Sequence, residues 1–146
     1  MLDYYLQILS PFIPTYVNGV QPILDWYSTI KDQPQWAFLF TSDADGMYNN
    51  IGTNHAIEVI GDRMDKMSSS PGFPANYPLR ARKPAMATIM RNNHFEFGDL
   101  SILQLLGTTM STSSACMWAT IYYGVHESET LIPKFKPQLK HGKMIR

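Results

Sequence analysis

Several features are scarce in this sequence of 146 residues, and each absence excludes a class of protein. One cysteine, Cys116, allows neither an intrachain disulfide nor a cysteine-rich zinc site. No apolar run reaches the roughly 18 residues that a membrane-crossing helix needs. The first residues lack the basic and apolar regions of a secretory signal peptide. We therefore expect an intracellular chain, nuclear or cytoplasmic, with no membrane partner.

Net charge is also missing, because 12 basic and 12 acidic residues cancel. The two halves nevertheless differ: residues 1–62 hold seven acidic residues and one basic residue, whereas residues 63–146 hold eleven basic and five acidic ones. Such a division can place a cation site beside a path for a polyanion, or it can produce two differently charged solvated faces. Charge alone favours the second interpretation.

The chain is 45% hydrophobic, which is enough for the core of one domain. Hydrophobic spacing and the positions of proline and glycine predict the order helix, helix, strand, helix, helix, hairpin, helix. The predicted elements are a helix near residues 2–9, a helix over 21–33, a buried strand at 36–40, a helix after Gly52, a helix over 84–90, a hairpin of 94–97 with 102–105, and a helix from Ala115. This order predicts an α+β fold rather than a wound parallel sheet.

Local signals predict where these elements begin and turn. Thr53 or Asn54 can cap the third helix, and Pro84 can open the fourth. The pair Gly98-Asp99 can form the hairpin turn. Cys116, on the last helix, is expected in the core as a small hydrophobic side chain. The segment from Pro133 onward is basic and shows no clear pattern.

Two carboxylates follow the predicted strand at residues 36–40. Asp43 and Asp45, two residues apart, project to the same side if the backbone stays extended, and Mg²⁺ prefers such oxygen ligands. Both can instead cap a turn before Gly46, which aspartate does well. These residues alone favour the turn.

The segment from Leu39 to Ile51 resembles the first palm motif of reverse transcriptases, in the form found in Penelope-like elements. In that motif an apolar strand delivers an aspartate, an aromatic residue follows five positions later, and Asn-Ile comes next. Asp43, Tyr48 and Asn50-Ile51 occupy these positions here.

A second motif of the same family follows in the expected order. Residues 107–116 resemble its Gly-Thr-Ala-Met-Gly-Thr-Pro loop, and residues 118–123 resemble the helix after that loop. Between the two motifs, residues 91–99 look like the hairpin that precedes the loop. The likeness extends over nearly the whole chain.

The resemblance implies a partial polymerase palm, an antiparallel sheet with packed helices, together with some of the fingers. Residues 1–35 would be fingers-like helices, residues 36–130 the palm, and residues 131–146 a basic tail leading to a third motif. The implied activity is that of an RNA-directed DNA polymerase, which transfers nucleotides by two-metal catalysis. The implied partners are an RNA template, a DNA primer and deoxynucleotides.

The resemblance also assigns site residues. Asp43 would be the catalytic carboxylate and a ligand of Mg²⁺ or Mn²⁺. Tyr48 would stack under the incoming sugar and screen for a 2′-hydroxyl. The other assigned contacts are Ala44 and Gly46, facing the triphosphate, and Gly107, Thr108 and Met110, in the loop over 107–113 that packs against the templating base pair.

The sequence departs from the family pattern at several points. Ser111 and Ser113 stand where the family has glycine and proline. Asp45 stands where the family commonly has a neutral residue, and we expect its side chain to face solvent. The family's third motif ends in Asp-Asp, and no Asp-Asp pair occurs in this chain, which ends at Arg146. We therefore expect a fragment of a larger polymerase that is inactive alone.

Two other functions are consistent with parts of the sequence. The basic half, with Arg80, Arg82, Lys83 and a basic tract from Lys134 onward, could belong to a non-catalytic nucleic-acid-binding remnant of a retroelement. The triplet over residues 43–45 also matches the Asp-x-Asp site of metal-dependent glycosyltransferases, although that chemistry has no need of the hairpin and loop. The sequence leaves the oligomeric state open.

Overall fold

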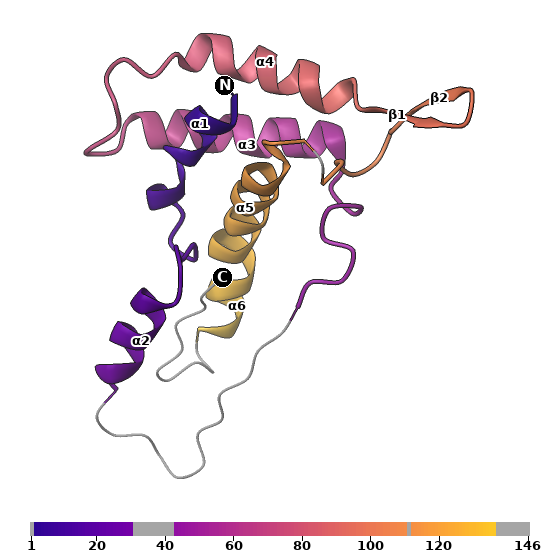
Figure 1. The fold of residues 1–146 in the computed structure, drawn as a ribbon. Coiled ribbons are helices and arrows are strands. Elements are labelled where there is room, and N and C mark those ends of the chain that lie inside the picture. The colour runs from indigo at the N-terminus through magenta and orange to yellow at the C-terminus, as the bar shows by residue number, and fades with distance from the viewer. Residues whose placement is uncertain (1, 31–42, 111, 137–146) are drawn as a thin grey trace.

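The computed structural model describes residues 2–30, 43–110 and 112–136, and the predicted strand at residues 36–40 lies outside them. The described part is α+β, as predicted: helices pack around a core, and one antiparallel hairpin projects from them (Figure 1). The elements in chain order are α1 (Leu2–Gln7), the 3-10 turn η1 (Ser10–Phe12), α2 (Gln21–Ser28), α3 (Thr53–Ser68), α4 (Leu79–Arg91), β1 (His94–Phe97), β2 (Leu100–Leu103), α5 (Ala115–His126), the π-helical turn η2 (Glu127–Leu131) and α6 (Ile132–Phe135).

The core lies where α3, α4, α5 and α1 meet. Helices α3 and α4 run side by side, and α5 descends from them next to α1 (Figure 1). Helical spacing predicts one apolar stripe of Ile57, Ile60, Met64 and Met67 on α3; the last three are buried, and Ile57 is half-buried against the core. Trp118 of α5 is fully buried among them and is the largest side chain in the core. Hydrophobic spacing at a period of 3.6 residues therefore locates the buried face of the long helices correctly.

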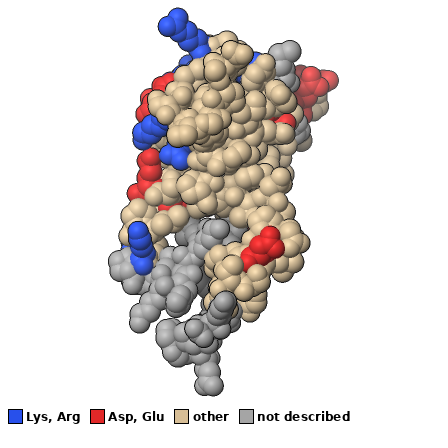
Figure 2. Space-filling view, turned by 90° about the vertical axis from the view of Figure 1, so that its left-hand side faces the viewer, with Lys and Arg blue, Asp and Glu red and all other residues tan. Residues whose placement is uncertain are grey.

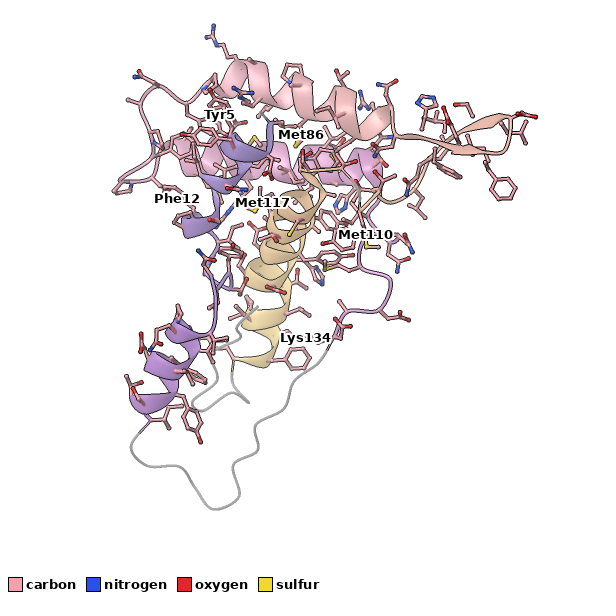
Figure 3. The ribbon with its side chains drawn as sticks, in the orientation of Figure 1. Tyr5, Phe12, Met86, Met110, Met117 and Lys134 are labelled. Atoms are coloured by element: carbon pink, nitrogen blue, oxygen red, sulfur yellow. The ribbon has the colours of Figure 1, made fainter. Side chains whose placement is uncertain are left out.

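Aromatic side chains attach the N-terminal helix α1 to the loop before α4. The Tyr77 hydroxyl donates a hydrogen bond to the Tyr5 carbonyl oxygen over 3.2 Å, and the two rings pack edge to face at 6.0 Å. The Arg82 guanidinium lies 3.3 Å from the centre of the Tyr5 ring, a cation–π contact. Phe73 packs against Tyr77 at 5.0 Å and extends the cluster toward Phe12 (Figure 3).

Burial raises the pKa of Tyr77 to about 12, with Arg82 opposing the shift and Tyr5 adding to it. Because a tyrosine in the unfolded chain ionises near pH 10, the folded state keeps a proton that the unfolded state loses between pH 10 and 12. We expect the free energy of unfolding to fall by about 1–2 kcal/mol over that window, after allowance for solvent screening. Urea unfolding at several pH values measures this, and Tyr77→Phe should remove most of the dependence; an unchanged dependence would contradict the assignment to Tyr77.

Helix α4 begins five residues before the predicted start. It starts at Leu79, so Pro84 lies inside it rather than at its first turn, and that prediction was wrong. Pro84 has no N–H for the Arg80 carbonyl, which removes one helical hydrogen bond. Contacts made by the early turns offset that loss, because Arg82 packs on Tyr5 and Lys83 pairs with Asp65 of α3.

The cap predicted for α3 was also wrong. The N-cap residue is Gly52, and no side chain donates or accepts a capping hydrogen bond there. Thr53 is the first helical residue, and its hydroxyl is directed instead toward the Leu105 carbonyl oxygen at 3.4 Å. The start of α3 is therefore attached to the segment that follows the hairpin.

The hairpin pairs Phe97 with Leu100 across a turn of Gly98-Asp99, as the turn signal predicted. Gly98 has a φ of 61°, the left-handed region that such two-residue turns require. This short turn places the second strand at Leu100–Leu103 rather than at the predicted 102–105. Every residue of both strands is exposed, and the hairpin extends away from the helices (Figure 1).

The chain after α5 continues as helix through η2 and into α6, which contains the start of the segment from Pro133 where the sequence showed no clear pattern. The backbone N–H of Ile132 bonds to the Glu127 carbonyl oxygen, five residues back, which is the wider π spacing. Pro133 follows at the start of α6 and has no N–H of its own to donate. Of the described residues, none belongs to a helix long and apolar enough to cross a membrane.

Candidate functional site

The two segments that resemble palm motifs lie against each other. The backbone N–H of Gly107 donates to the Ile51 carbonyl oxygen over 2.8 Å, and that of Thr108 donates to the Tyr48 carbonyl oxygen over 2.9 Å. Gly107, Thr108 and Ile51 are buried. A stretch of more than fifty residues separates the two segments in the chain, so the fold itself brings them together. We call this contact the motif junction, meaning residues 46–51 and 107–110.

The motif junction has no room for a side chain at position 107. A Cβ added to Gly107 would lie 2.7 Å from the Tyr48 carbonyl oxygen and 2.9 Å from the Asn49 Cα atom. Gly107 also has a φ of 82°, which side-chain-bearing residues rarely adopt. Both the conformation and the close backbone approach therefore require glycine.

Asp43 and Ala44 are exposed at the start of this site. The Asp43 Oδ1 atom accepts a hydrogen bond from the Ala44 backbone N–H over 2.9 Å. From Asp45 the backbone turns, and the N–H groups of Asn49 and Asn50 both reach the Gly46 carbonyl oxygen, over 3.0 and 3.1 Å. The turn therefore begins at Asp45, which is itself exposed.

Helix α5 also contacts the first motif segment, residues 43–51. The Tyr123 hydroxyl donates to the Met47 carbonyl oxygen over 2.8 Å. The pKa of Tyr48 is raised by burial first, and then by the electrostatic influence of Cys116 and a hydrogen bond with its side chain. Cys116 is exposed at the start of α5, so its predicted place in the core was wrong. It lies at the edge of the site, against Tyr48.

The loop between the motif junction and α5 is held by short hydrogen bonds. The hydroxyl oxygens of Thr109 and Thr112 are 2.6 Å apart, and the Ala115 N–H donates to the Thr112 carbonyl oxygen. Met110 projects from this loop with 76% of its surface exposed, close to the first motif (Figure 3). Thr108 is buried, and its hydroxyl has no hydrogen-bond partner among the described residues. Ser111 lies outside the described residues.

The carboxylates of the site can supply one or two ligands to a metal. Within residues 2–30, 43–110 and 112–136, no group of three or more His, Cys, Asp or Glu side chains is placed to hold an ion. Asp43 and Asp45 are exposed and carry no salt bridge among those residues. A divalent ion here would need most of its ligands from outside these side chains, as Mg²⁺ can take them from water and phosphate oxygens.

Sequence reasoning missed the supporting residues of this site. His55 lies within 2.9 Å of the Tyr122 hydroxyl, and Tyr123 anchors Met47, yet the sequence motifs assign neither tyrosine to the site. The adjacent pair on α5 was the available signal, because one helix can present two polar aromatic tips to neighbouring segments. Comparison with family models, curated proteins and solved structures finds no match to this chain.

Proposed function

We propose that this chain is part of the palm of an RNA-directed DNA polymerase of retroelement type. The observation that carries the proposal is the motif junction, in which the Gly107 and Thr108 amides bond to Ile51 and Tyr48. The two segments resemble the family's motifs independently of each other along the sequence. A shared site needs them adjacent in space, and they are.

The exposed residues around the junction can meet a nucleotide and its template. Asp43 would bind the divalent ion of a deoxynucleoside triphosphate, and that ion would offset the charge developing on the phosphates. Ala44 adds little bulk beside the phosphates, and Gly46 allows the chain to turn sharply after Asp45. Tyr48 would stack under the incoming sugar. The hydrogen bond from the Thr108 N–H to its carbonyl oxygen would hold Tyr48 in place. Met110, exposed on the loop, would face the templating base pair.

We expect the chain by itself to lack polymerase activity. Two-metal nucleotidyl transfer needs carboxylates that clamp both ions, and the sequence holds no Asp-Asp pair to join Asp43. With one carboxylate the ions are poorly held, and the rate should fall by orders of magnitude. The chain would then retain nucleotide binding without turnover.

Thermal unfolding with ligand tests the proposal. Mg²⁺ with a deoxynucleoside triphosphate should stabilise the protein, by about 1.4 kcal/mol at a ligand concentration ten times Kd. Asp43→Asn should abolish this, and the neighbouring Asp45→Asn should keep it. Primer extension on the same sample should give no templated product.

Other results would redirect the assignment. Stabilisation by a sugar nucleotide but not by deoxynucleotides would favour the glycosyltransferase interpretation. Salt-dependent RNA binding that Asp43→Asn leaves unchanged would favour a non-catalytic nucleic-acid-binding remnant. The described basic residues give that alternative little support, because Arg82 and Lys83 are engaged within the fold and charges of both signs share the face seen in Figure 2.

A further inference from the structure

The projecting hairpin has one wholly apolar face. The strand register places Phe95 opposite Ile102 and Phe97 opposite Leu100, so these four side chains share a face. Their exposed fractions are 45, 37, 75 and 64%, respectively. The opposite face carries His94, Glu96, Ser101 and Leu103. The hairpin is thus amphipathic, and nothing among the described residues covers its apolar side.

Two strands of this kind are marginal on their own. An isolated hairpin in water is barely stable, whereas three or more strands with an apolar face, or a hairpin packed on a helix, hold together. No helix of the described residues buries either strand. The hairpin therefore requires additional strands or a cover. Glu96 and Asp99 are both acidic and exposed here, which disfavours a phosphate backbone as that partner.

The register also shows which backbone groups are free. Residues that flank a two-residue turn form a hydrogen-bonded pair, so the N–H and C=O groups of Phe95 and Phe97 point toward β2. The bond from the Gln104 N–H to the Asn93 carbonyl oxygen, 2.8 Å, continues this alternation. The backbone groups of His94 and Glu96 consequently point outward from the β1 edge.

We propose that the β1 edge pairs with the β1 edge of a second copy of this chain, antiparallel and centred on Phe95. In this register His94 of each copy lies opposite Glu96 of the other, and their outward backbone groups form hydrogen-bonded pairs. Phe95 meets Phe95 across the two-fold axis on the apolar face. The product is a four-stranded sheet with one continuous apolar face.

The side chains support this register over the alternatives. The His94 Nδ1 atom lies 3.1 Å from the Asn92 carbonyl oxygen, so Nδ1 carries the proton of that bond, and the imidazolium form presents its Nε2–H to a carboxylate. Each dimer then contains two imidazole–carboxylate pairs related by symmetry. Pairing through the β2 edge would instead set Ser101 opposite Leu103, which offers no such complementarity. Charge therefore selects the β1 edge.

Sedimentation of the full chain over a concentration series tests the proposal. The wild type should show a concentration-dependent monomer–dimer equilibrium. Glu96→Lys places an ammonium group opposite His94 at both pairs and should weaken dimerisation about 10-fold. The double variant His94→Glu with Glu96→His reverses both partners and should restore it. Asp99→Lys makes the same acidic-to-basic change in the exposed turn, away from both pairs, and should leave dimerisation unchanged.

A backbone variant separates edge pairing from side-chain effects. Glu96→Pro removes an outward N–H that β2 does not use, so the hairpin should persist while the dimer is lost. A wild type that stays monomeric at every concentration would overturn the proposal. Dimerisation that survives both Glu96→Lys and Glu96→Pro, or that Asp99→Lys abolishes, would overturn the assignment to the β1 edge.

Discussion

Replacing Gly107 with alanine is expected to lower the free energy of unfolding by about 3 kcal/mol, from a strained backbone and a steric clash together. The left-handed conformation contributes about 1–2 kcal/mol of this loss for any residue with a Cβ. The remainder comes from the Tyr48 carbonyl oxygen, which would lie 2.7 Å from the new atom and must move. Chemical denaturation measures the total.

Gly72 provides the matched control for that substitution. Its φ of 84° is almost the same as that of Gly107, but a Cβ at Gly72 would meet nothing within 4 Å. Gly72→Ala should therefore cost about 1–2 kcal/mol, the backbone strain alone. The Thr108 amide should also exchange with solvent faster in Gly107→Ala and not in Gly72→Ala. Equal losses in the two variants would mean that the motif junction is not tightly packed.

Trp118→Ala is expected to lower the free energy of unfolding by about 3–5 kcal/mol, because it truncates the largest side chain in the core. Trp118 is fully buried on α5, the helix that contacts both α1 and α3, and its removal leaves a cavity at their meeting point. For a domain of ordinary stability, about 5–15 kcal/mol, this is a large share of the total. Thermal and denaturant unfolding should both show it.

Two further substitutions test whether the loss of stability in Trp118→Ala comes from the lost buried volume. Trp118→Phe keeps most of the apolar volume and removes an indole N–H that has no partner in the described part of the chain, so we expect a loss of about 1–2 kcal/mol. Leu24→Ala removes a side chain that is 54% exposed on α2, and should change stability by no more than about 0.5 kcal/mol. If Trp118→Ala lowered the free energy of unfolding by no more than Leu24→Ala does, Trp118 would not lie at the centre of the core.

The regular parts of the fold could be predicted because their signals are local. The stripe Ile60, Met64 and Met67 follows from helical periodicity, and Gly98-Asp99 marks the hairpin turn. The start of α4 could not be predicted, because its early turns are held by contacts of Arg82 with Tyr5 and of Lys83 with Asp65, residues that are distant in sequence. Tertiary contacts overrode the local preference of Pro84 for a first turn.

The candidate site could be predicted only as separate segments. The resemblance singles out Asp43, Tyr48 and Gly107, but the linear sequence gives no distance between residues 48 and 107. The backbone bonds from Gly107 and Thr108 depend on how α3 and α5 pack, and that packing is a property of the whole core. The exposed Cys116 was missed for the same reason: its place beside Tyr48 depends on the junction and not on helix periodicity.

Residue-resolved nucleotide binding tests the central claim most directly. On addition of Mg²⁺ and a deoxynucleoside triphosphate to the isotope-labelled protein, amide chemical shifts should change together in residues 43–48 and 107–110. Asp43→Asn should abolish both sets of changes, and Asp45→Asn should preserve them. Shifts that are absent, that fall outside both segments, or that persist in Asp43→Asn would contradict a nucleotide site at the motif junction.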